Sequence, residues 1–185
     1  MNATKKRQIQ FYILRLLILL VILLVYTVLH EGGHALVAIL AGAPVRDFNI
    51  NFFNISAHVG LTSDVKPSWL PPFDIAGIGI PLLVWLVLVL ATSKNTSWIL
   101  RIVKFFSSVI VLFSLLPWIV IPFLIMAHNL PNDDSTSFII HSGIYPPLVA
   151  IGALLIFSGG WLLYWEKTGG LKREIEYLRK GDRKV

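Results

Sequence analysis

The chain contains no cysteine and few charged residues. None of its 185 residues is a cysteine, which excludes disulfide bonds and zinc sites built from thiolates. Charged residues make up only 14% of the sequence, whereas ordinary soluble domains carry about 25%. Hydrophobic residues account for 56%, and the mean hydropathy is +0.75. Because a chain with so little polar surface would aggregate in water, the composition predicts an integral membrane protein surrounded by a lipid bilayer.

Acidic residues are scarce, and the basic residues gather near the two ends of the chain. The 10 acidic and 16 basic side chains give a net charge of +6 at neutral pH. The basic clusters lie at residues 5–7 and between residues 167 and 184. Such clusters favour the cytoplasmic face of a membrane over a nucleic-acid partner. A cleavable signal peptide is the alternative for the N-terminus, but the apolar run from Phe11 to Leu29 exceeds the usual signal core.

Four segments are long and apolar enough to cross a bilayer. They are residues 9–40, 73–91, 98–127 and 147–165. At about 1.5 Å per residue the first would reach about 48 Å, whereas the hydrocarbon core is about 30 Å thick. This segment must therefore tilt, protrude or break, and Gly32-Gly33 is a plausible weak point. Pro117 and Pro122 are expected to kink the third segment.

A short polar segment separates the first two spans. Residues 45–61 partly alternate between apolar and polar side chains, which is typical of one or two short β-strands. The sequence thus predicts an all-α membrane protein of about four transmembrane helices, with a small β-hairpin or short sheet after the first. Residues 1–165 form one polytopic membrane domain in this interpretation, and residues 166–185 form a basic cytoplasmic tail.

The distribution of lysine and arginine predicts that both termini are cytoplasmic. With the N-terminus inside, the basic connection between the second and third spans also lies inside, as does the C-terminal tail. The two connections placed outside carry few cations, namely Arg46 and Lys66. This topology puts the C-terminal part of the first span and the polar segment after the third span on the same membrane face.

The first span contains the pentapeptide His30-Glu31-Gly32-Gly33-His34. Ionisable side chains at this depth are costly, since hydrocarbon does not solvate charge, so their presence indicates a functional site. On a helix, two histidines four residues apart project from the same face and can share one Zn²⁺. Glu31 would then accept a proton from water as the water attacks a peptide carbonyl. The alternative is a glycine pair for close helix packing, with histidines that are hydrogen-bonded to neighbours.

Two imidazoles leave a catalytic zinc incomplete, because such sites usually have three protein ligands. We favour an aspartate at the end of the third span, with Asp134 as first choice and Asp133 close behind. The other acidic and histidine candidates are Asp47, Asp64, Asp74, His58, His128 and His141. The three histidines lack paired spacing and are expected to be interfacial or hydrogen-bonded. The aspartate pair has its own alternative, which is to cap a short helix that runs through His141.

These motifs resemble the site-2 protease family of intramembrane metalloproteases. HEGGHALVAILAG is similar to the family's H-E-x-G-H-A helix, and residues 45–61 resemble its short membrane-associated sheet. The segment Asn129 to Asp134 resembles a second family motif, although Ser135 stands where the family has glycine. No PDZ-like insertion is present, so the resemblance is to a minimal member. It implies a zinc-dependent endopeptidase that cuts a transmembrane or membrane-proximal segment of a membrane protein.

Two other functions remain open at the level of the sequence. A catalytically silent membrane scaffold or regulator would keep the same fold without the chemistry. A metal transporter is disfavoured, because no other span carries an array of carboxylates or histidines. Asn129 is a conceivable donor to the oxyanion of the reaction. Neither the substrate sequence nor the oligomeric state follows from these residues.

Overall fold

The structure is a computed structural model that describes residues 3–51, 56–92, 96–127 and 131–168. His128 and Asn129 therefore lie outside the described residues, as does the predicted tail beyond residue 168. The elements in chain order are α1 (Ala3–Leu40), β1 (Val45–Asn51), β2 (Ser56–Leu61), the 3₁₀ turn η1 (Pro67–Trp69), α2 (Leu70–Ala91), α3 (Trp98–Phe113), α4 (Leu116–Met126), α5 (Asp134–Ser142) and α6 (Pro146–Thr168).

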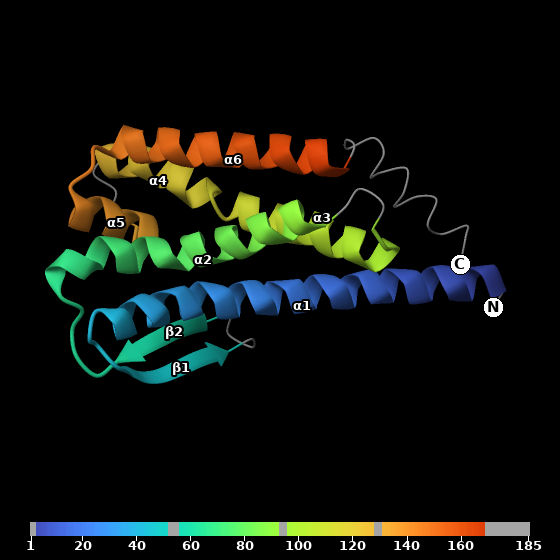
Figure 1. Cartoon of the computed structure of the whole chain (residues 1–185), viewed down its shortest axis with the longest axis horizontal. Helices are drawn as coiled ribbons and strands as arrows, with labels where there is room; N and C mark the ends of the chain where they lie inside the picture. The colour runs from blue at the N-terminus through green and yellow to red at the C-terminus, as the bar shows by residue number, and fades with distance from the viewer. Residues whose placement is uncertain (1–2, 52–55, 93–95, 128–130, 169–185) are drawn as a thin grey trace.

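The expected fold class is confirmed. Four helical stretches of the described chain are long and apolar enough to cross a membrane, and α3 with α4 forms the third of them. A two-stranded antiparallel sheet follows the first helix. In Figure 1, α1 begins and α6 ends at one end of the bundle, whereas the hairpin and α5 lie at the opposite end. Which end faces the cytoplasm stays a prediction from the basic residues.

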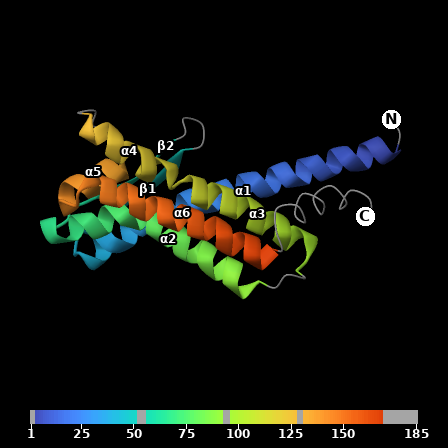
Figure 2. The same cartoon turned by 90° about the horizontal axis from the view of Figure 1, so that it is seen from above.

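Helix α1 is one unbroken helix of 38 residues. At about 1.5 Å per residue it extends about 57 Å, nearly twice the hydrocarbon thickness. It does not break at Gly32-Gly33, because the second of these glycines packs against α2. A Cβ atom on Gly33 would collide with the backbone carbonyl of Ala76. Figure 2 shows α1 diverging from the other helices toward its N-terminus, so its excess length leaves the bundle instead of bending.

The third membrane span is divided into α3 and α4. Helix α3 ends at Phe113, and α4 begins at Leu116 with Pro117 in its first turn. A proline lacks the N–H that would bond to the carbonyl four residues earlier, and its ring collides with that carbonyl. For Pro117 the carbonyl belongs to Phe113, which is the last residue of α3. The predicted kink at Pro117 is thus a short interruption, while Pro122 lies inside α4.

The hairpin packs beside the C-terminal end of α1. Asn51 pairs with Ser56 next to the turn, and the register shifts between Val45 and Asp47. Gly42 adopts a left-handed conformation with φ of 81°, which lets the chain leave α1 and enter β1. A small apolar cluster of Ala38, Ala41, Ala43 and Val65 joins the helix to the segment after β2.

The main core lies between α2, α3, α4 and α6. Its buried members are Ile78, Trp85, Val89, Val111, Leu112, Leu115, Trp118, Ala153 and Tyr164. Within this core the indole N–H of Trp85 donates to the hydroxyl of Ser108 at 2.8 Å. That hydroxyl donates in turn to the carbonyl of Lys104 at 2.7 Å. The core therefore holds α2 firmly against α3, and α2 forms the support against which the polar site is assembled.

Candidate metal centre

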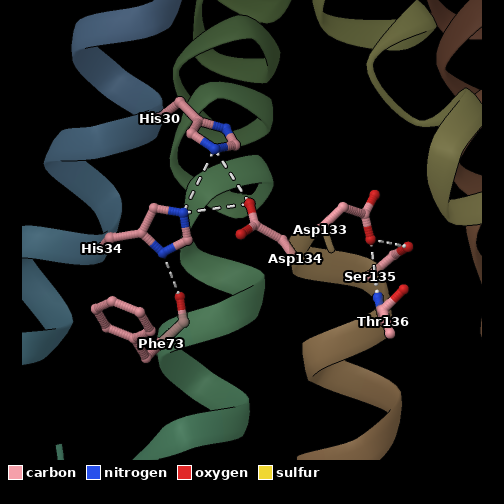
Figure 3. Close-up of polar contacts among 7 residues, drawn as sticks. All are labelled: His30, His34, Phe73, Asp133, Asp134, Ser135 and Thr136. Carbon is pink, nitrogen blue, oxygen red and sulfur yellow. Dashed lines mark hydrogen bonds and ion pairs between the residues drawn. The ribbon is translucent and has the colours of Figure 1, made fainter. Parts of the chain in front are cut away.

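Helix α1 presents two histidine rings side by side. His30 and His34 are one turn apart on the same face, and their ring centroids lie 5.0 Å apart. Their Nε2 atoms are separated by 3.4 Å. The predicted pairing of imidazoles on one helical face is therefore present, and both rings face the gap between α1 and α5 (Figure 3).

Asp134 approaches this pair from the first residue of α5. Its Oδ2 lies 3.1 Å from Nε2 of His30 and 3.3 Å from Nε2 of His34. The three residues form a group of metal-ligating side chains, although they come from positions about one hundred residues apart in the chain. Figure 3 shows the carboxylate of Asp134 pointing toward both rings.

The distances among these three atoms match what a zinc ion requires. Donors placed at about 2.0–2.2 Å from a tetrahedral zinc are separated from one another by about 3.3–3.6 Å. The observed separations of 3.1, 3.3 and 3.4 Å are close to that range. The donor set of two imidazoles and one carboxylate also suits zinc, and it leaves a fourth position for water or substrate.

The hydrogen bond on the far side of His34 fixes which nitrogen faces the group. Nδ1 of His34 lies 2.7 Å from the backbone carbonyl of Phe73 on α2. Because a carbonyl only accepts, Nδ1 carries the proton and Nε2 of the neutral ring presents a lone pair. A lone pair and a carboxylate oxygen thus lie 3.3 Å apart. Two such acceptors repel each other unless a proton or a metal ion lies between them, which supports a cation site.

Gly77 on α2 provides the space beside the two rings. A Cβ atom at this position would collide with Nε2 of His34 and would lie 2.7 Å from Cε1 and 2.9 Å from Nε2 of His30. Any larger residue would therefore fill the region where the ligand atoms converge. The close approach of α1 to α2 depends on this glycine and on Gly33 of the facing helix.

The histidines also determine the charge of Asp134. Partial burial by itself raises the pKa of this carboxyl group. When the two imidazoles are protonated, their hydrogen bonds and positive charge outweigh the burial and hold the pKa of Asp134 well below its ordinary value. Asp134 is therefore ionised at neutral pH, and it can offset part of the charge of a bound divalent ion.

Comparison with known proteins gives a match to the profile of a protein family. The profile of the family described as Peptidase M50B-like matches residues 8–130, which is more than half of the chain. The chain belongs to this family. No curated protein and no solved structure matches the chain.

Membership in this family confirms the expected resemblance to the site-2 proteases. The matched range contains His30, Glu31 and His34 and ends before Asp134. A metallopeptidase family and four membrane-spanning helices together indicate an intramembrane protease with a metal site. Within the described residues, the group formed by His30, His34 and Asp134 is suited to hold that metal.

Asp133 and Asp134 have different surroundings, although they are neighbours. Asp133 is the N-cap of α5, and its Oδ1 accepts from the backbone N–H of Thr136 at 2.9 Å. The same oxygen accepts from the hydroxyl of Ser135 at 2.8 Å. Figure 3 shows this side chain directed away from the two imidazoles. Both sequence interpretations of the pair are thus represented, since Asp133 caps the helix while Asp134 faces the histidines.

Among the described residues, the other acidic and histidine candidates do not belong to the group of three. His58 is exposed on β2, and Asp47 lies 3.7 Å from Arg46 on the hairpin. Asp64 is exposed after β2. Asp74 is buried on α2 and is bonded to His141 of α5. Glu31 is only 8% exposed and lies beside His30 on α1.

Sequence reasoning missed three features of the site. The carbonyl of Phe73 has no side-chain signature, so no motif could have indicated it. Gly77 lies within an apolar span, and its contact with the rings depends on the packing of two helices. The pairing of Asp74 with His141 joins residues 67 positions apart. A buried acidic residue at the start of an apolar span was the only available signal for this pair.

Proposed function

We propose that this chain is an intramembrane zinc metalloendopeptidase, which hydrolyses a peptide bond in or near a transmembrane segment of a membrane protein. The observation that carries the proposal is the convergence of His30, His34 and Asp134 within 3.4 Å of one another. Family membership supports it independently. In this proposal the three residues are the protein ligands of Zn²⁺, and Asp134 rather than Asp133 supplies the carboxylate.

Each residue of the site has a defined task in the proposed reaction. When bound, zinc supplies Lewis acidity that polarises the peptide carbonyl and acidifies water. Phe73 holds His34 in the tautomer whose Nε2 is available as a ligand. Glu31 acts as the general base: it takes the proton of the attacking water and later delivers it to the leaving amine. At 8% exposure this side chain is largely shielded from bulk solvent.

An apolar cavity beside the site supports a membrane-embedded substrate. The cavity has a volume of about 480 Å³ and lies between α1, α2 and α3. Its walls include Leu29, which directly precedes His30, and Tyr26, whose ring centroid lies 6.0 Å from that of His30. A largely apolar space of this kind suits aliphatic side chains of a transmembrane segment better than a polar peptide from solution.

The proposal is tested with the full chain reconstituted in lipid nanodiscs. The probe is a fluorescent, internally quenched peptide with an apolar segment of about 20 residues, long enough to span a bilayer. Glu31→Gln should retain one zinc per chain by elemental analysis and lose cleavage by about 10²–10⁴-fold, as expected for a general base. Glu166→Gln removes an exposed carboxylate at the end of α6 and serves as the matched control with unchanged cleavage.

Two outcomes would contradict the proposal. If Glu31→Gln cleaved the peptide as fast as the wild-type chain, Glu31 would not be the base. If the wild-type chain bound zinc tightly but cleaved neither this peptide nor a panel of related spanning peptides, the catalytically silent scaffold would become the better interpretation.

A further inference from the structure

Helix α5 is a short helix that is capped at both ends. Its nine residues lie between the N-cap Asp133 and the C-cap Gly143, which adopts φ of 67°. Asp134 is the first residue of this helix and His141 is the eighth. Seven residues correspond to almost two full turns, so both side chains project from the same face of α5 and are about 10 Å apart along its axis.

His141 attaches this face of α5 to α2. Its Nδ1 lies 2.7 Å from Oδ2 of Asp74, whose side chain is only 6% exposed, whereas that of His141 is 33% exposed. A buried carboxylate is costly unless it is paired and hydrogen-bonded. The contact is therefore a strong and directional constraint on where α5 lies along α2.

One turn of α2 contacts both helices that supply the metal-ligating group. The carbonyl of Phe73 accepts from His34 of α1, and the next residue, Asp74, accepts from His141 of α5. Gly77, one turn later on the same helix, lies against both imidazoles of α1. The first turns of α2 thus contact both α1, which bears the histidine pair, and α5, which bears Asp134. These contacts fix the position of one helix relative to the other.

Helix α5 is also held by apolar contacts. Phe138 packs against Trp118 of α4 with ring centroids 5.5 Å apart, and Ile139 is buried. Apolar contacts of this kind have little directional preference, so they tolerate small rotations and shifts better than a hydrogen bond does. Among the described contacts between α5 and other helices, the hydrogen bond between Asp74 and His141 is therefore best suited to fix the rotation of α5 about its axis.

We propose that Asp74 and His141 are positioning residues for the third metal ligand, and that they set the rotation and height of α5 at which Asp134 meets His30 and His34. This inference rests on the proposed metal site. A carboxylate about 5 Å from the helix axis moves by about 2 Å when the helix rotates by about 20°. Metal–ligand distances tolerate deviations of only about 0.2 Å. A small loss of orientation at His141 is therefore enough to remove Asp134 from coordination.

The test measures metal affinity instead of proteolysis. The full chain in nanodiscs is titrated with Zn²⁺ against a chromophoric chelator, and the absorption spectrum of its Co²⁺-loaded form reports the coordination number. Asp134→Ala gives the reference values for the loss of the third ligand. His141→Ala and Asp74→Ala should each weaken zinc binding by about 10–100-fold, which is the usual effect of losing an orienting partner. Their Co²⁺ spectra should shift toward that of Asp134→Ala.

Conservative and distant substitutions separate positioning from folding. His141→Gln and Asp74→Asn keep a donor and an acceptor at these positions, and they should recover most of the lost affinity. Substitution of His141 should disturb folding less than substitution of Asp74, because the side chain of His141 is partly exposed and its removal leaves no large cavity. His58→Ala removes an exposed histidine on β2 and should bind zinc like the wild-type chain.

A double-mutant cycle decides the outcome. If Asp74 and His141 act through Asp134, His141→Ala should cause no further loss of zinc affinity in the Asp134→Ala background. An unchanged affinity of His141→Ala in the wild-type background, or an equally large loss in both backgrounds, would overturn the inference. A wild-type chain that fails to bind zinc would instead overturn the proposed function, so the two failures are distinguishable.

Discussion

The two halves of α1 belong to one continuous helix but have opposite surroundings. In the first half, large aliphatic side chains such as Leu20 are about half exposed, at 52%. In the last third, Ala38 is fully buried at 0%, and Glu31 and His34 are nearly so. The helix therefore exposes its large apolar residues and buries small and ionisable ones.

Small residues and paired polar groups drive the packing of α1 against the other helices. Lipid tails are as apolar as leucine, so a bilayer provides no hydrophobic force that would bury the first half of α1. Close packing arises instead where small residues let two backbones approach and where polar groups find partners. In α1 both conditions are met near Gly33 and the histidine pair, and the cost of burying ionisable groups there is offset by their mutual contacts.

The largest effect is expected from a methyl group placed beside the ligand atoms. In Gly77→Ala the new Cβ would collide with Nε2 of His34, so the rings or α2 must shift. Overpacking of this kind costs about 1–3 kcal/mol, which corresponds to a loss of about 5–150-fold in metal affinity. Isothermal titration with Zn²⁺ measures it.

The matched control for Gly77→Ala is Gly79→Ala. This glycine lies on the same helix, and nothing lies within 4 Å of a Cβ placed there. Equal zinc affinities for the two variants would contradict the assignment of Gly77 to the site.

A smaller effect is expected where α1 packs on α2. Gly33→Ala places a Cβ against the carbonyl of Ala76, while alanine improves helix propensity by about 1 kcal/mol. We expect a net loss of up to about 2 kcal/mol in the free energy of unfolding, since overpacking costs about 1–3 kcal/mol. Titration with SDS in mixed micelles measures it.

Gly32→Ala is the natural comparison for this variant. No atom lies within 4 Å of its added Cβ, so it should be neutral or stabilising. A destabilisation as large as that of Gly33→Ala would show that the effect lies in the helix itself and not in its contact with α2.

The smallest effect is expected in the exposed half of α1. Leu20→Ala removes a side chain that is half exposed and should change the free energy of unfolding by less than about 0.5 kcal/mol. The same substitution at Leu112, which is fully buried in the main core, should cost about 2 kcal/mol or more through the cavity that it leaves. A large loss for Leu20→Ala in the SDS titration would mean that this half of α1 is packed against a partner in the membrane.

Much of the fold and part of the site could be predicted from local patterns. The four apolar segments and the alternation in residues 45–61 are patterns among neighbouring residues of the chain. They were therefore sufficient to predict the helices and the hairpin. The pairing of His30 with His34 followed from helical periodicity alone. The interruption between α3 and α4 was only partly predictable: Pro117 indicated a kink, and the backbone geometry determined that the helix stops at Phe113.

The sequence by itself determined a membrane protein with a pair of histidines on one face of its first helix, because composition and periodicity are properties of the chain. Only the tertiary structure distinguished Asp134 from Asp133, since the cap of α5 turns one carboxylate toward Thr136 and the other toward α1. It also brought the carbonyl of Phe73 to His34 and joined Asp74 to His141. These contacts depend on how separate helices approach one another, and distances between helices cannot be read from the order of residues in the chain.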